Sequence, residues 1–374
     1  MPGLRVAVVG AGPAGVSVAV ALKDRGVTPM LIDQAGQVGA SWLGRYDRLK
    51  LNTGRQFSHL PARRYPRGTP IFPTRDQVIA LLERHAHEDG IELRLSTAVE
   101  RIDPNGDGWR LHTNTDPIDA PQVVVATGYD HTPLIPDWPG RDSFAGALLH
   151  ASQYKNPAPY AGQRVLVVGS GCSGMEIAYD LAKCAAAKVW LAVRTPPNIM
   201  IRQGPAGLPG DVIATPLYHL PIRIADAIAR FGRRMNVGDL SAHGLPVPSE
   251  GVFSRSARLG VAPAIVDKEV IEAIKGGDIE IVSGVESLDT DGAWLTDGSH
   301  LEPNAVICAT GYRSGLEPLV GHLGVLDERG KPRIHGQPAA RGLRFIGFIP
   351  RPSQIGYAAK QARRAARDIA RELR

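Results

Sequence analysis

Two glycine-rich segments have the residue types and the spacing that bind the pyrophosphate of a dinucleotide. Gly-Ala-Gly-Pro-Ala-Gly occupies residues 10–15, and Gly-Ser-Gly-Cys-Ser-Gly occupies residues 169–174. In such a segment the first glycine permits a tight turn, the second lets a phosphate approach the backbone, and the third lets a helix pack close to a sheet. The free N–H groups and the positive dipole end of the following helix complete the phosphate site.

The elements around the first segment form a βαβ pattern that ends in an acidic residue. Residues 4–9 predict a buried strand, residues 16–26 a helix, and residues 28–33 a second strand. Asp33 stands 23 positions after Gly10, where a carboxylate hydrogen-bonds ribose hydroxyls and repels a 2′-phosphate. The segment therefore predicts an FAD or NAD site rather than a chance glycine turn. Its predicted contacts are Gly10, Gly12, Gly15 and Asp33.

The same pattern returns around the second segment, with a basic residue in place of the acid. Residues 164–168 and 188–194 predict strands, and residues 175–184 predict a helix. Arg194 stands 25 positions after Gly169, where a guanidinium pairs with a 2′-phosphate, and Thr195 is a candidate helper. This module is predicted to prefer NADPH to NADH. The alternative is a surface arginine at a strand end.

A further repeat closes each module. Val-Val-Val-Ala-Thr-Gly-Tyr at 123–129 and Val-Ile-Cys-Ala-Thr-Gly-Tyr at 306–312 predict buried strands that end in a sharp turn beside the nucleotide. The candidate contacts at these turns are Thr127, Gly128, Thr310 and Gly311. A chain with one acid-selected and one base-selected dinucleotide is most simply a flavoprotein that takes hydride from NADPH.

The predicted fold class is α/β, with two dinucleotide-binding Rossmann-like domains and the NADPH domain inserted in the FAD domain. We expect the FAD domain at 1–156 and 322–374, and the NADPH domain at 157–321. An insertion near 204–262, with a helix at about 222–235, is expected to cover the nicotinamide side. Residues 345–350 predict a short strand and residues from about 355 a final helix.

Composition narrows the class of protein. The 374 residues are 43% hydrophobic and 21% charged, which is typical of globular domains. The net charge is +6; the basic residues are scattered apart from the C-terminal stretch Lys360 to Arg374, and no nucleic-acid motif accompanies them. Three cysteines without a C-x-x-C motif or metal-ligand spacing favour a reducing compartment and argue against a dithiol reductase. The apolar run at 6–22 is interrupted by turn-forming residues, so we expect a cytoplasmic protein with no membrane and no nucleic-acid partner.

The segment between the two modules carries a family resemblance. Phe144, Gly146, His150 and Tyr154 spell F-x-G-x-x-x-H-x-x-x-Y, which resembles the motif of the class B flavin-dependent monooxygenases (FMO-like). The resemblance runs nearly end to end. Tyr-Asp-Arg-Leu-Lys-Leu at 46–51 and Gln-Phe-Ser-His-Leu-Pro at 56–61 are most similar to plant-type, YUCCA-like indole-3-pyruvate monooxygenases.

The resemblance implies an activity and two cofactors. NADPH reduces FAD, reduced flavin reacts with O2 to give a C4a-(hydro)peroxyflavin, and one oxygen atom passes to a small organic substrate. The substrate is an α-keto acid such as indole-3-pyruvate, which loses CO2, or a nucleophilic nitrogen or sulfur. Baeyer–Villiger insertion is less favoured because Tyr154-Lys155 replaces the ending of its motif variant. The implied oligomer is a monomer or a homodimer.

The resemblance also implies roles for individual residues. Gln34 and Trp42 match positions that flank the FAD ribose and ring. Asn52 matches an asparagine over the flavin, although plant-type enzymes often have histidine there. His150 and Tyr154 belong to the linker motif and are candidate catalytic residues with Asn52. The matched NADPH contacts are Gly169, Gly171, Ser173, Gly174 and Arg194.

Other interpretations remain open from the sequence. His150 is alternatively a structural hydrogen-bonding residue, Tyr154 a packing residue of the linker, and Phe144 a core residue. Cys172, inside the second glycine segment, is interpreted as a small packing residue rather than a redox switch. The alternative functions are a flavin-dependent NAD(P)H reductase or electron-transfer protein without oxygen insertion, and a nucleotide-binding redox sensor.

Overall fold

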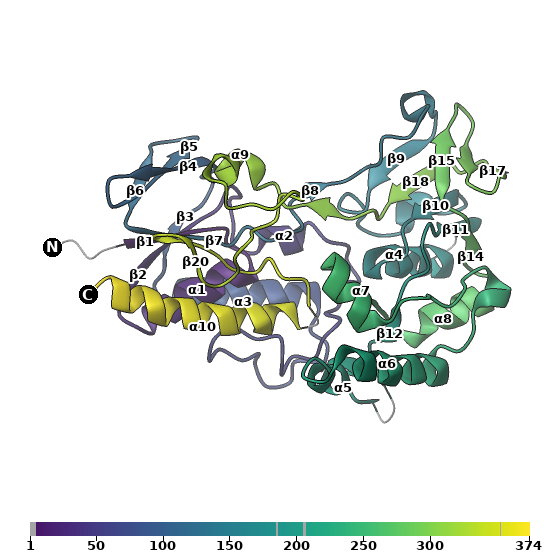
Figure 1. Cartoon of the computed structure of the whole chain (residues 1–374). Coiled ribbons are helices and arrows are strands. Elements are labelled where there is room, and N and C mark those ends of the chain that lie inside the picture. The colour runs from purple at the N-terminus through teal and green to yellow at the C-terminus, as the bar shows by residue number, and fades with distance from the viewer. Residues whose placement is uncertain (1–4, 185, 205–206, 352) are drawn as a thin grey trace. The chain divides into compact units, whose positions relative to one another are not determined.

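The computed structural model describes residues 5–184, 186–204, 207–351 and 353–374 (Figure 1). The chain divides into two compact units. Unit 1 comprises the residues up to 44 together with 49–132 and 312–374, and unit 2 comprises 45–48 and 133–311. The chain therefore passes between the units four times, and the short strands β8 (Thr132–Pro133) and β19 (Tyr312–Arg313) lie at the last two passages.

Unit 1 is built on a six-stranded sheet in the order β20-β21-β7-β1-β2-β3. Neighbouring strands are parallel except for β20 and β21. The central strands consist mostly of buried β-branched and aliphatic residues, as expected when both faces of a parallel sheet are covered. Their bounds are β1 Arg5–Val9, β2 Thr28–Ile32, β3 Glu92–Arg94, β7 Gln122–Val125, β20 Pro338–Ala340 and β21 Leu343–Phe345.

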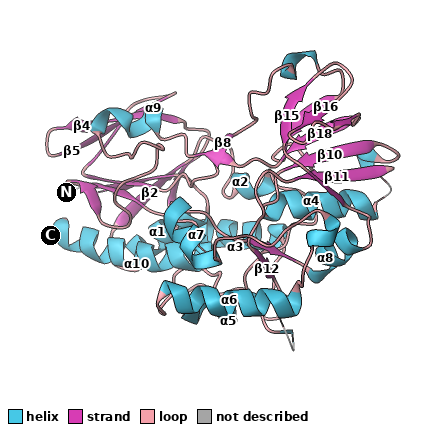
Figure 2. Cartoon of the chain, turned by 45° about the vertical axis from the view of Figure 1, so that its right-hand side comes forward, coloured by secondary structure: helices cyan, strands magenta, loops and turns pink. Residues whose placement is uncertain are grey.

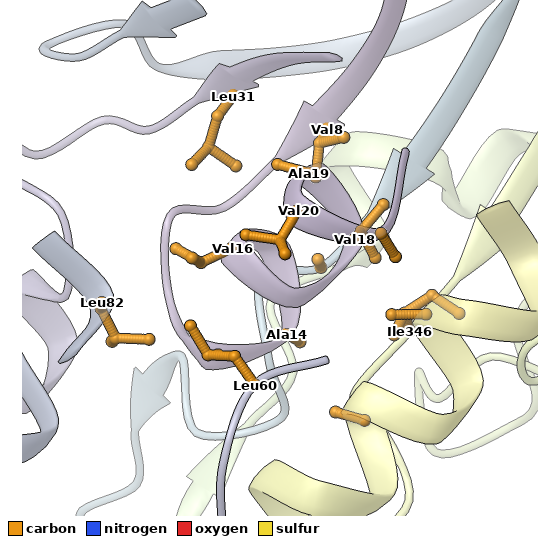
Figure 3. Close-up of a cluster of buried hydrophobic side chains, with 14 of the residues drawn as sticks. Val8, Ala14, Val16, Val18, Ala19, Val20, Leu31, Leu60, Leu82 and Ile346 are labelled. Atoms are coloured by element: carbon orange, nitrogen blue, oxygen red, sulfur yellow. The ribbon is translucent and has the colours of Figure 1, made fainter. Parts of the chain in front are cut away.

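Helices and a small second sheet cover the two faces of this sheet. On one face, α1 (Pro13–Lys23), α3 (Arg75–Glu88) and α10 (Gln354–Glu372) bury an apolar cluster with the strands. Figure 3 shows Val16 and Val20 of α1 among Val8, Leu31 and Leu82 of this cluster. The other face packs on an antiparallel sheet and a short helix: β4 Val99–Asn105, β5 Gly108–Thr113, β6 Ile118–Ala120 and α9 Glu317–Val320.

Unit 2 repeats the plan with a five-stranded parallel sheet in the order β14-β11-β10-β18-β9. Helices α4 (Cys172–Lys183) and α8 (Lys268–Lys275) belong to this unit. An antiparallel sheet of three strands packs on the apolar cluster that also includes Phe144. The strand bounds are β9 Ala147–His150, β10 Arg164–Val168, β11 Lys188–Ala192, β14 Glu280–Val282, β15 Val285–Leu288, β16 Ala293–Leu295, β17 His300–Leu301 and β18 Ala305–Cys308.

Between β11 and α8 the chain forms an extra helical subregion, visible in Figure 2 as α5, α6 and α7. Its elements are β12 Ile199–Ile201, α5 Gly210–Leu217, α6 Ile222–Asn236, α7 Val252–Leu259 and β13 Ala264–Val266. The predicted helix at about 222–235 is confirmed as α6. Residues 205 and 206 of the predicted insertion lie outside the described residues. Within the described ranges, no helix is both long and apolar enough to cross a membrane.

The α/β prediction is confirmed, but the unit boundaries lie earlier than expected. Segment 133–156 was assigned to the FAD domain, yet β9 pairs in parallel with β18 and completes the sheet of unit 2. Segment 312–321 was assigned to the NADPH domain, yet Leu316, Leu319 and Val320 pack in a core cluster of unit 1. Residues 45–48, expected in the FAD domain, also belong to unit 2.

Two element predictions need correction. The strand expected at 345–350 lies instead at Leu343–Phe345, because Gly347 has φ +89° and cannot continue an extended strand. Both predicted nucleotide-binding helices begin inside the glycine segments, at Pro13 and Cys172, rather than after them. Pro13 is compatible with a helix start because the first N–H groups of a helix have no intrahelical partner.

Candidate active site

The first glycine loop joins β1 to α1 in unit 1, and two of its three glycines leave no room for a side chain. Gly10 has φ +106°, and a Cβ there would lie 2.7 Å from the carbonyl oxygen of Ala126. A Cβ on Gly15 would overlap the carbonyl oxygen of Gly10. The nearest atom to a Cβ on Gly12 is the Ser41 hydroxyl, at 3.8 Å. The loop is therefore tightly packed at its two ends and open at the start of α1, where an anion is stabilised.

Asp33 follows the end of β2 and is held against this loop. Its two carboxylate oxygens accept hydrogen bonds from the backbone N–H groups of Ala11, at 2.6 Å, and Ala35, at 2.9 Å. Each carboxylate oxygen has two lone pairs, so both retain capacity for a further donor such as a ribose hydroxyl. The predicted acid and the predicted loop are therefore brought together within one unit.

The side-chain hydroxyl of Thr127 is a polar group that no other described residue hydrogen-bonds. Its hydroxyl is buried and, among the described residues, has no hydrogen-bond partner. It is the second residue after the end of β7, and the carbonyl oxygen of the intervening Ala126 lies against Gly10 of the glycine loop. A buried hydroxyl without a partner lowers the stability of the folded protein unless a ligand or a water molecule hydrogen-bonds to it. The unused hydroxyl and the open position at Gly12 both fit a nucleotide cofactor at this loop.

The other residues predicted to contact FAD lie in less decisive surroundings. Gln34 is exposed next to Asp33. Trp42, in the short helix α2 (Ala40–Leu43), packs partly against the apolar cluster of unit 1. Asn52 is half-buried between the buried residues Leu51 and Thr53, and Thr53 exchanges a 2.6 Å hydrogen bond with Ser58. The contacts of Gln34, Trp42 and Asn52 with a flavin stay predictions.

The second glycine loop has the same construction in unit 2. Gly169 has φ +111°, and a Cβ there would lie 2.5 Å from the carbonyl oxygen of Ala309. A Cβ on Gly174 would overlap the carbonyl oxygen of Gly169. A Cβ on Gly171, by contrast, would have no atom within 4 Å. Gly171 is the N-cap of α4 and no side chain caps the helix there, so a phosphate has both space and unpaired N–H donors.

Arg194 lies two residues beyond the end of β11 and is exposed, as is Thr195. A Cβ on Gly284 would lie 3.3 Å from the Cβ of Arg194, so this neighbour provides space beside the arginine. In the part of the chain that the structure describes, no carboxylate pairs with Arg194. The guanidinium is therefore available to a 2′-phosphate. A solvated surface arginine, which is the alternative interpretation, would have the same geometry.

His150 is buried, and both of its ring nitrogens are hydrogen-bonded. It is 1% exposed at the end of β9. The backbone N–H of Ser152 donates to Nδ1 at 3.1 Å, which makes Nδ1 an acceptor and leaves the proton of a neutral ring on Nε2. Nε2 then donates to the carbonyl oxygen of Gly311 at 3.0 Å. The ring thus holds the Ala-Thr-Gly turn after β18, where the Thr310 hydroxyl donates to the carbonyl oxygen of Leu134.

Tyr154 is fully buried and its hydroxyl donates to Asp180 at 2.7 Å. Burial, together with this carboxylate, raises the pKa of Tyr154 well above its ordinary value, so the hydroxyl keeps its proton. Asp180 also accepts from Arg48 at 3.3 Å, and the Arg48 guanidinium lies over the Tyr179 ring at 4.8 Å. Tyr154 is therefore packed and hydrogen-bonded inside unit 2, and its role as a candidate catalytic residue stays a prediction.

Segment 45–48 is docked on unit 2 by these same contacts. The rings of Tyr46 and Tyr154 are 6.4 Å apart, and burial raises the pKa of Tyr46. The backbone N–H of Asp47 donates to the carbonyl oxygen of Lys155 at 2.8 Å. The Tyr-Asp-Arg part of the motif at 46–51 is therefore a structural component of unit 2.

A buried ion-pair network next to the second glycine loop was not predicted from the sequence. Arg202, 4% exposed, donates to Glu176 of α4 at 2.5 Å and to Asp267 at 2.9 Å. Burial raises the pKa of Glu176, while the Arg202 charge opposes that rise. The signal available in the sequence was a pair of acids, Glu176 and Asp180, spaced four residues apart in a mostly apolar helix, because a buried carboxylate requires a charged partner.

The cysteines show no redox arrangement. The Cys172 thiol accepts from the backbone N–H of Ile265 at 3.2 Å, and burial raises its pKa. Burial raises the pKa of Cys308 to about 12. Cys172, Cys184 and Cys308 are all unpaired. Across the described residues, no group of three or more histidine, cysteine, aspartate or glutamate side chains is placed to hold a metal ion.

Two family models match the chain. Residues 7–202 match the pyridine nucleotide-disulphide oxidoreductase model, and residues 109–320 match the flavin-binding monooxygenase-like model. Among curated relatives, the indole-3-pyruvate monooxygenase YUCCA1 of Oryza sativa subsp. japonica is 33% identical over 92% of this chain and 86% of its own length. YUCCA8 of Oryza sativa subsp. indica is 34% identical over 97% of this chain and 90% of its own length.

Solved structures share the fold at lower identity. A flavin-containing monooxygenase from Stenotrophomonas maltophilia has a TM-score of 0.76 at 22% identity, and the alignment covers 100% of both chains. A structure of OTEMO with FAD and NADP has a TM-score of 0.71 at 16% identity, covering 100% of this chain and 84% of that one.

Two parallel α/β units, each with a glycine loop at the start of a helix, define an oxidoreductase that uses two dinucleotides. The chain belongs to the flavin-binding monooxygenase-like family. It is an NADPH- and FAD-dependent monooxygenase, as the sequence resemblance implied.

Proposed function

We propose that this monooxygenase acts on an aromatic α-keto acid of the indole-3-pyruvate type. The supporting observation is the similarity to plant indole-3-pyruvate monooxygenases at 33% and 34% identity over more than nine-tenths of the chain. In the proposed reaction R–CO–COO⁻, O2, NADPH and H⁺ give R–COO⁻, CO2, H2O and NADP⁺. One oxygen atom enters the product carboxylate, and the other leaves as water.

Unit 1 would hold FAD at the first glycine loop. The N–H groups at the start of α1 would bind the pyrophosphate at the open side of Gly12, and Asp33 would accept from ribose hydroxyls. The buried Thr127 hydroxyl would gain a partner. When bound, FAD accepts hydride from NADPH and, once reduced, reacts with O2.

Unit 2 would hold NADPH at the second loop. The start of α4, with Gly171 and Ser173, would bind the pyrophosphate, and Arg194 would pair with the 2′-phosphate. His150 would act as a positioning residue by fixing the Gly311 turn. Asn52 is proposed to donate a hydrogen bond near the reacting oxygen, because its amide is a neutral donor that no pH change removes.

The unpaired cysteines favour a reducing, cytoplasmic compartment. No nucleic-acid motif accompanies the basic residues, and we propose a monomer or a homodimer.

The test is an assay of the FAD-loaded protein for NADPH oxidation and O2 uptake with indole-3-pyruvate, an alkyl sulfide and a tertiary amine. We expect tight coupling with the keto acid, one CO2 per NADPH, and indole-3-acetate by mass spectrometry with one atom from ¹⁸O2. Coupled oxygenation of the sulfide or amine alone would reject the keto-acid proposal within the same enzyme class. NADPH oxidation that yields only H2O2 with every substrate would point to the reductase alternative.

A further inference from the structure

The extra helical subregion of unit 2 carries most of the exposed apolar side chains. Eight of the fourteen exposed large hydrophobic side chains among the described residues lie between positions 208 and 235. We call this set the α5–α6 apolar surface. Its members are Leu208, Ile213, Leu220, Ile222, Ile224, Ile228, Phe231 and Met235. Scattered exposed apolar residues are ordinary, whereas a contiguous patch of them marks an interaction site, so what matters here is how these side chains are arranged.

Helix α6 has one face fixed to the protein and another face open. Ala225 and Ala229 pack on a cluster with Val252 and Phe253 of α7. The buried Asp226 accepts from the backbone N–H of Phe253 at 2.7 Å, which fixes the rotation of the helix about its axis.

The open face of α6 is a single apolar stripe. Ile224, Ile228, Phe231 and Met235 are spaced by four, three and four residues, so they align along the helix. Their exposed fractions are 50%, 42%, 68% and 70%. Figure 2 shows α6 as a long helix beside α5. The stripe is as long as the helix and has no covering element among the described residues.

The charge beside the stripe is positive. Arg223, Arg230 and Arg234 lie on one flank of the stripe, are exposed, and form no ion pair with any described residue. The single acid of the helix, Asp226, is buried and already bonded to α7. At the end of the helix a hollow of about 390 Å³ is lined by Arg234, Met235, Lys268, Lys275 and the acid Glu272, among others.

We propose that the α5–α6 apolar surface binds the surface of a bilayer that contains anionic phospholipids. An amphipathic helix with large apolar residues on one side and arginines beside them suits the boundary between headgroups and acyl chains. Charge complementarity selects this occupant over a second copy of the chain. Packing α6 against its own copy would bring arginines together with no exposed acid on the helix to pair with them.

The experiment is flotation of the FAD-loaded enzyme with vesicles of phosphatidylcholine alone or mixed in equal amounts with phosphatidylglycerol. We expect binding to the mixed vesicles that weakens as salt is raised, and much weaker binding to the neutral vesicles. Arg230→Gln is expected to lower the partition coefficient about fivefold, the effect of one arginine near an anionic surface. Phe231→Ser is expected to lower it by at least about tenfold.

Matched controls separate this surface from general apolar or basic character. Ile334→Ser removes an exposed apolar side chain of unit 1, and Arg364→Gln removes an exposed arginine of α10; both are expected to bind vesicles like the unchanged enzyme. Flavin absorbance and the unfolding temperature show that each variant is folded.

Three results would overturn the proposal. They are no binding to the anionic vesicles, equal binding by Phe231→Ser, or a dimer in sedimentation that Phe231→Ser dissociates. The last would assign the surface to a second copy of the chain.

Discussion

Gly171→Ala is expected to separate NADPH binding from folding. The new Cβ would have no protein atom within 4 Å, and the backbone at φ −76° and ψ −177° is accessible to alanine. Alanine is a weaker N-cap than glycine, which lowers the stability of the folded protein. Alanine also lowers the conformational entropy of the unfolded chain, which stabilises the folded protein by about 0.4–1 kcal/mol. The two effects oppose each other, so the free energy of unfolding should change by less than about 1 kcal/mol.

The loss of NADP⁺ affinity should be large, because the new methyl group would occupy the space through which the pyrophosphate reaches the start of α4. If two hydrogen bonds to the charged phosphates are lost at about 1.5 kcal/mol each, the dissociation constant rises roughly a hundredfold. Titration calorimetry of the FAD-loaded protein with NADP⁺ measures this change, and urea unfolding measures stability. Flavin absorbance should be unchanged, since the first loop is intact.

Three variants complete the comparison. Gly232→Ala, in α6, also meets no atom within 4 Å and should bind NADP⁺ normally. Gly12→Ala should show the reciprocal loss, of FAD. Gly174→Ala should fail to fold, because its Cβ would overlap the carbonyl oxygen of Gly169. Normal NADP⁺ affinity in Gly171→Ala would refute the placement of the pyrophosphate at this helix start.

Four further outcomes are expected. Arg194→Ala should raise the KM for NADPH far more than the KM for NADH in steady-state kinetics. An equal rise for both would contradict the pairing of Arg194 with the 2′-phosphate. Asn52→Ala should raise H2O2 release per NADPH while FAD binding stays intact; unchanged coupling would exclude it from the site. Tyr154→Phe removes a hydrogen bond to a buried carboxylate and should cost about 1.5–3 kcal/mol in urea unfolding, with no effect on stability arguing against the observed bond to Asp180. Burial lowers the pKa of His335 in the folded protein. As the pH falls, this histidine is therefore protonated at a higher pH in the unfolded chain than in the folded one, and the free energy of unfolding should decrease below about pH 6.5. His335→Gln should lessen this acid loss, and an identical pH profile would contradict the assignment.

The parts of the fold that depend on local pattern were predictable. Residues 164–168 form β10 as expected, and Gly10 and Gly15 occupy positions where a Cβ would collide with backbone. The spacing from Gly10 to Asp33 also follows from one βαβ unit, which brings the acid against the loop. Such features are encoded within about thirty residues and need no distant partner.

Features that depend on distant segments were missed or misplaced. Nothing near Arg202 in the sequence indicates that it pairs with Glu176 and Asp267. The apolar run at 345–350 was predicted as one strand, yet β21 ends at Phe345. Ile346 makes one more hydrogen bond, to the carbonyl oxygen of Val125, and Gly347, with φ +89°, does not continue the extended backbone. The unit boundary near 133 was obscured because β9 finds its neighbour, β18, far along the chain.

The assignment of residues 45–48 to unit 2 has a consequence for the order of synthesis. The ribosome releases Tyr46 and Arg48 long before Tyr154 and Asp180 exist, so this segment must wait, solvated, for the unit that it completes. Unit 1 waits longer still, because β21 and α10 are made last. The nascent chain is therefore expected to finish its inserted unit before β7 gains its neighbour β21 and before α1 gains its partner α10. A gene fragment for residues 133–311 alone would encode a unit without its Tyr-Asp-Arg segment.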